Sequence, residues 1–115
     1  MTAFAFVFPG QGSQAVGMLD AWGDHPAVRA TLAEASQALG EDVAALIAQG
    51  PKEQLDLTTN TQPVMLTAGI ACFRAWLAEG GREPAALAGH SLGEYTALVA
   101  SGALPLADAL PLVRF

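Results

Sequence analysis

The chain has 115 residues, of which 52% are hydrophobic and 14% are charged, so it is long enough to bury a core and too apolar to be disordered. Eleven acidic residues against five scattered basic ones give a net charge of −6, which argues against nucleic acid as a partner. The single cysteine, Cys72, excludes an internal disulfide and a multi-cysteine metal site, and we predict no metal. With neither a signal-peptide pattern nor a membrane-spanning run, the sequence predicts a cytoplasmic protein.

The first predicted element is a buried strand over residues 3–8, a short apolar run that Pro9 stops. The loop that follows, residues 10–14, contains two glycines and no bulky side chain, so another group can approach its backbone closely. This loop formally fits the dinucleotide-binding fingerprint Gly-x-Gly-x-x-Ala. A Rossmann unit also needs a second strand and an acidic residue, whereas we expect the chain to continue here as helix.

Residues 26–80 are predicted to form a helical segment between two strands. Apolar residues at helical spacing predict helices over residues 26–39 and 42–49 and a further turn at 52–56. A central, buried helix is predicted over residues 64–79, and the polar residues 58–63 lead into it. We expect His25 to be exposed at a helix start. Gln62, just before the central helix, is expected either to cap that helix or to face a cleft.

A second strand is predicted over residues 85–89, and it leads into the pentapeptide Gly89-His90-Ser91-Leu92-Gly93. Gly-x-Ser-x-Gly between a strand and a helix is the sequence form of a nucleophile elbow, in which the serine hydroxyl stands exposed at a sharp turn. The candidate nucleophile is therefore Ser91. The N–H of Leu92 would point to where an oxyanion develops, near the positive end of the following helix. An ordinary turn can carry the same pattern.

The last predicted elements are a helix over about 92–100 and another from about Pro105, which contains Pro111 and is still running at Phe115. Only two strands are evident in the whole chain, and a two-stranded parallel sheet is not a stable domain. We therefore expect these 115 residues to be part of a larger domain.

Two motifs together, residues 8–14 and 89–95, resemble the malonyl-CoA:acyl carrier protein transacylases of bacterial fatty acid synthesis, which are related to polyketide synthase acyltransferase domains. Asn60-Thr61-Gln62-Pro63 between them also looks like this family, and the resemblance covers essentially the whole chain. It implies an α/β fold, namely the N-terminal part of an α/β-hydrolase-like large subdomain with a parallel sheet. Residues 1–115 would then be an incomplete acyltransferase domain.

The resemblance also implies a mechanism of acyl transfer. Ser91 would carry a malonyl group from coenzyme A to the phosphopantetheine thiol of acyl carrier protein, and both thiols enter as parts of substrates rather than as cofactors. The backbone N–H groups of Gln11 and Leu92 would form the oxyanion hole. His90 points to the opposite face from Ser91, because neighbouring strand residues alternate, so it is expected to line the cleft rather than to act as base.

In this family the base is a histidine far downstream, and an arginine pairs with the malonyl carboxylate. The family pattern places that arginine one position beyond Phe115, so Arg114 is not assigned the role. The expected partners are malonyl-CoA, acyl carrier protein and the missing remainder of the domain. Two alternatives stay open: a serine esterase of α/β-hydrolase type, and a binding module whose glycine loop holds a phosphate.

Overall fold

The computed structural model describes residues 4–10, 12 and 14–114, and within them it has mixed helix and strand structure with a small parallel sheet. This confirms the predicted α/β class. The elements in chain order are β1 (Ala5–Phe8), the short 3-10 helix η1 (Asp20–Trp22), α1 (Pro26–Leu39), α2 (Val43–Gln49), α3 (Lys52–Leu55), α4 (Thr58–Ala78), β2 (Ala86–Gly89), α5 (Gly93–Ala100) and α6 (Leu106–Arg114). Among the described residues, no helix is long and apolar enough to cross a membrane.

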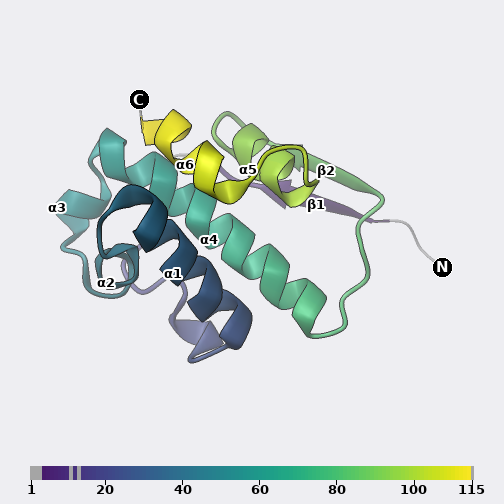
Figure 1. Cartoon of the computed structure of the whole chain (residues 1–115), viewed down its shortest axis with the longest axis horizontal. Coiled ribbons are helices and arrows are strands. Elements are labelled where there is room, and N and C mark those ends of the chain that lie inside the picture. Colours follow the sequence, from purple (N-terminus) through teal and green to yellow (C-terminus); the bar gives the residue numbers. More distant parts are fainter. Residues whose placement is uncertain (1–3, 11, 13, 115) are drawn as a thin grey trace.

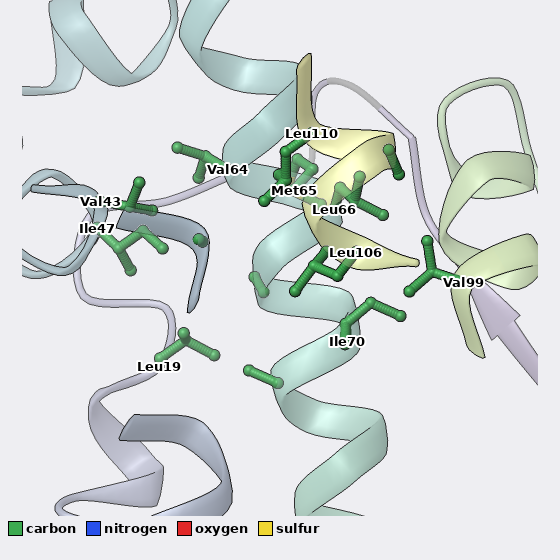
Figure 2. Packing of buried hydrophobic residues seen from close by; sticks show 14 of the residues in the cluster. Leu19, Val43, Ile47, Val64, Met65, Leu66, Ile70, Val99, Leu106 and Leu110 are labelled. Atoms are coloured by element: carbon green, nitrogen blue, oxygen red, sulfur yellow. The ribbon is translucent and has the colours of Figure 1, made fainter. Parts of the chain in front are cut away.

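The core is built around α4, which runs through the middle of the molecule and packs against α1, α5 and α6 (Figure 1). This helix is apolar almost all round, so it buries side chains toward several neighbours at once. Figure 2 shows Leu66 and Ile70 of α4 against Leu106 and Leu110 of α6, all of them essentially inaccessible to solvent. The predicted central helix is therefore confirmed as the scaffold of the fold.

The sheet consists of β1 and β2, which pair in parallel with Phe6 opposite Leu87 and Phe8 opposite Gly89. Phe6 and Phe8 both contact Phe73 of α4, so α4 covers one face of the sheet. The other face is open, and Val7 is 69% exposed there. Among the described residues, the predicted buried strand is therefore buried on the face toward α4, where Phe8 lies, and exposed at Val7 on the other.

The predicted start of α4 is also wrong, because the helix begins at Thr58 and includes the supposed lead-in. Pro63 has no N–H to donate to the Thr59 carbonyl one turn earlier, which would normally weaken a helix at this point. The guanidinium of Arg114 supplies the missing donor, since its Nε lies 3.1 Å from the Thr59 carbonyl oxygen. Gln62 consequently lies inside the helix, half-buried, and does not cap it.

Two smaller differences separate the sequence-based predictions from the structure. Residues 16–22 form turns and η1 instead of continuing as regular helix. His25 does cap α1, accepting the Ala27 N–H at Nδ1, but its side chain is only 14% exposed and its Nε2 lies 3.4 Å from a carboxylate oxygen of Glu79. Pro111 lies within α6, as predicted, and on the exposed side of that helix.

Candidate active site

The turn between β2 and α5 carries the backbone outlier of the structure. Ser91 has a φ angle of 56°, and it is the one non-glycine residue with positive φ among those described. The turn closes through a hydrogen bond from the Gly93 N–H to the His90 carbonyl, 2.9 Å long. Such a conformation costs about 1–3 kcal/mol and occurs preferentially at functional sites. The predicted strand, sharp turn and helix are all present at this position.

Both glycines of the pentapeptide lie so close to other backbone atoms that neither position has room for a Cβ atom. A Cβ atom on Gly89 would overlap the Gly93 carbonyl, so the chain can fold back on itself only without a side chain there. A Cβ on Gly93 would overlap the carbonyl of Phe8 at the end of β1. The elbow is therefore wedged against the end of the neighbouring strand, which holds Ser91 in its strained conformation.

The backbone N–H of Leu92 lies next to Ser91. The Leu92 N–H has no acceptor among the described residues, although the Leu92 side chain is buried with 5% of its surface exposed. This amide stands immediately before α5, where helix amides and the helix dipole favour negative charge. Ser91 itself is exposed. The arrangement can present a hydroxyl and an adjacent N–H to one small polar group.

The glycine loop after β1 lies against this elbow. A Cβ built on Gly10 would stand 2.7 Å from the His90 carbonyl oxygen and 3.5 Å from Cβ of Ser91, so the loop backbone is in contact with the elbow. The Gly12 N–H donates to Oε1 of Gln14 at 2.8 Å. Gln11, the other predicted oxyanion donor, lies outside the described residues.

A charged pair supports the far side of this loop. Nε2 of Gln14 donates to Oδ1 of Asp56 at 3.0 Å, and Nζ of Lys52 forms an ion pair with the same carboxylate. The hydrogen bond from Lys52, and then that from Gln14, lower the pKa of Asp56 below its usual value, and Asp56 in turn raises the pKa of Lys52. Sequence reasoning missed these residues, because Gln14 and Asp56 are 42 positions apart.

The remaining predicted site residues are placed as follows. His90 is exposed beside Ser91 at the end of β2. Gln62 lies on α4, and no hydrogen bond joins it to the elbow among the described residues. Arg114 is engaged elsewhere, pairing with Glu41 and donating to Thr59. The described part of the chain holds no cluster of three His, Cys, Asp or Glu residues that could bind a metal.

Comparison with known proteins identifies a family for this chain. The acyl transferase domain family matches residues 5–115. The malonyl CoA-acyl carrier protein transacylase of Escherichia coli (strain K12) is 59% identical over 115 residues, and that of Haemophilus influenzae is 50% identical over 116; each match covers 99% of this chain and 37% of the relative. The chain therefore spans about a third of the length of these relatives.

Solved structures agree with this result. The acyl-carrier-protein S-malonyltransferase from Burkholderia pseudomallei 1710b matches with a TM-score of 0.96 and 67% identity, covering 98% of this chain and 37% of that one. A malonyl-transacylase in complex with a type II PKS acyl-carrier protein matches with a TM-score of 0.93 and 51% identity, over the same shares of the two chains. The chain belongs to the acyl transferase domain family.

Proposed function

We propose that this chain supplies the nucleophile and oxyanion hole of a malonyl-CoA:acyl carrier protein transacylase. The observation that carries the proposal is the conformation of Ser91, whose φ is 56°. It sets an exposed hydroxyl beside the Leu92 N–H, which has no acceptor within the described part of the chain. We take malonyl as the acyl group and acyl carrier protein as its acceptor because the relatives are named for them. The single cysteine fits a reducing compartment, and we include a cytoplasmic location in the proposal.

The proposed reaction has two steps. In the first, Oγ of Ser91 attacks the thioester carbonyl of malonyl-CoA, its proton passes to a base, and coenzyme A leaves as the thiol, which gives a malonyl ester on Ser91. In the second, the phosphopantetheine thiol of acyl carrier protein attacks that ester and regenerates the hydroxyl. No resident cofactor is needed, because both thiols belong to substrates.

The oxyanion formed in each step would accept hydrogen bonds from backbone N–H groups of Leu92 and Gln11. Each donor of this type is worth about 3–4 kcal/mol of transition-state stabilisation. The contact of Gly10 with the His90–Ser91 segment supports a role for the glycine loop in this hole. We assign the base and the arginine that binds the malonyl carboxylate to the part of the longer relatives that this chain does not span.

The test joins this chain to the part of the E. coli relative that lies beyond the aligned region, a protein we call the joined protein. We expect it to gain one malonyl mass at Ser91 on mixing with malonyl-CoA, and to pass that group to acyl carrier protein. Ser91→Ala is expected to abolish the labelling, whereas Ser101→Ala, an exposed serine just after α5, is expected to keep it.

Two outcomes would contradict this function. Labelling that persists in the Ser91→Ala protein would show that another residue carries the acyl group. Rapid hydrolysis of simple esters without transfer to the carrier thiol would instead favour a serine esterase. The unmodified E. coli relative serves as the control for substrate and carrier quality.

A further inference from the structure

A hydrogen-bonded chain ties the glycine loop to a segment far away in the sequence. The Gly12 N–H donates to Gln14, and the Gln14 amide donates to Asp56, with distances of 2.8 and 3.0 Å. Lys52 pairs with the same carboxylate. A loop rich in glycine loses much conformational freedom when it is ordered, so a fixed geometry needs specific contacts to hold it.

Hydrogen bonds and a buried neighbour connect the Asp56 end to the core. The Asp56 N–H donates to the Lys52 carbonyl at 2.8 Å, which fixes its backbone at the end of α3. Its neighbour Leu55 is fully buried, and the Leu55 carbonyl accepts a hydrogen bond of 2.6 Å from the Thr61 hydroxyl. The Asp56 carboxylate therefore extends from a backbone segment that is anchored to the core of the molecule.

The Gln14 side chain fits its place because an amide can both donate and accept. The Asp56 carboxylate only accepts, so the NH₂ group of Gln14 must face it, and the amide oxygen is left to receive the Gly12 N–H. A glutamate at position 14 would offer no donor and would set two carboxylates against each other. The hydrogen bond therefore has a fixed direction, from Gln14 to Asp56, which substitutions can remove or reverse.

We propose that Gln14 and Asp56 are positioning residues that hold the glycine loop against the nucleophile elbow during acyl transfer. This inference rests on the proposed function, in which the loop supplies an oxyanion donor from Gln11. Both neighbours of that residue are held: Gly10 by its contact with the elbow and Gly12 by Gln14. Because the Gly12 N–H is already paired, it is not free to serve the oxyanion itself.

The experiment measures single-turnover malonylation of Ser91 in four joined proteins: unsubstituted, Gln14→Glu, Asp56→Asn and the double variant Gln14→Glu/Asp56→Asn. Gln14→Glu is expected to lower the saturated acylation rate about 10- to 100-fold with little change in the malonyl-CoA concentration at half-saturation, because misplacing a catalytic donor affects the transition state more than binding. Asp56→Asn alone is expected to act mildly, since its amide oxygen can still accept from Gln14.

The double variant is the decisive member of the set. Its asparagine can donate to the glutamate at position 14, which can still accept from Gly12, so we expect it to recover most of the lost rate. Gln49→Glu makes the same chemical change at an exposed position at the end of α2 and is expected to have no effect. Should Gln14→Glu fail to fold, Gln14→Met removes both hydrogen bonds while keeping the shape of the side chain.

A second readout separates this inference from the proposed function. Hydrogen exchange of the Gly12 amide, followed by NMR, is expected to speed up about tenfold in Gln14→Met, because that amide loses its acceptor. Exchange that is unchanged in Gln14→Met, or a double variant no faster in acylation than Gln14→Glu, would overturn the positioning role. An unsubstituted joined protein that never labels Ser91 would overturn the proposed function even where the exchange result holds.

Discussion

Ser91 holds a backbone conformation that glycine adopts with less strain. Replacing it with glycine is expected to remove the reactive hydroxyl and to raise the free energy of unfolding by about 1 kcal/mol, because the strain relieved exceeds the added flexibility of the unfolded chain. Ser91→Ala keeps a Cβ atom and is expected to give no such gain. Urea unfolding of the two variants measures the difference. Equal stabilities would mean that the surrounding turn, rather than Ser91 itself, carries the strain.

The Asp56 carboxyl reports on the contact between the glycine loop and α3. Lys52→Met is expected to raise the pKa of Asp56 more than Gln14→Met does, because the hydrogen bond from Lys52 is the larger cause of its lowered value. A lowered pKa in the folded state stabilises the fold above the unfolded value and loses this effect as the pH falls through the folded one. The loss of this stabilisation is therefore confined to pH below about 4. An NMR titration of the Asp56 carboxyl carbon tests the order of the two shifts.

At the level of single residues, the sequence predicts what a local pattern can encode. Ser91 can be identified from the sequence because two glycines at fixed spacing predict the sharp turn that exposes its hydroxyl. The pairing of Gln14 with Asp56 leaves no such signal, since it depends on how α3 packs against a loop 42 positions earlier. For Gln62 the local pattern is misleading. Its position before a proline predicts a helix boundary, yet α4 begins at Thr58 and includes both residues.

Helix α4 depends on α6 for its first turns. Pro63 leaves the Thr59 carbonyl without its helical donor, and Arg114 fills the place while also pairing with Glu41. Arg114→Met is therefore expected to lower the free energy of unfolding by about 1–2 kcal/mol. Arg114→Lys keeps the charge but has no planar fork to serve both partners, so an intermediate loss is expected. Chemical denaturation of both variants measures this, and a lysine variant as stable as the original would show that charge alone matters.

The same helix shows why element boundaries are hard to predict. The long apolar run from Val64 onward identifies α4, but its polar first turns lie outside that run. The donor that Pro63 lacks in these turns comes from a guanidinium 55 residues further along the chain. By contrast, the ends of α1 and α2 agree with the sequence, because a glycine closes each of them locally.

At the scale of the whole molecule, the described residues form an α/β arrangement in which α4 covers one face of the two-stranded sheet. Parallel strands are ordinarily covered on both faces, and the open face here carries apolar side chains, with Val7 as the most exposed. The relatives of this chain are nearly three times as long. The short apolar strands therefore indicate the class of fold, but they do not by themselves determine what covers each face of the sheet.

This open face can be tested with one substitution. Val7→Thr exchanges a methyl group for a hydroxyl and keeps a β-branched side chain, so in the 115-residue chain, where Val7 is 69% exposed, we expect a change in unfolding free energy within about 0.5 kcal/mol. In the joined protein the same hydroxyl would be buried without a partner, and we expect a loss of about 1–3 kcal/mol. Urea unfolding of the four proteins measures both effects. Equal changes in the two settings would mean that the face stays exposed and that the parallel sheet is completed only at its edges.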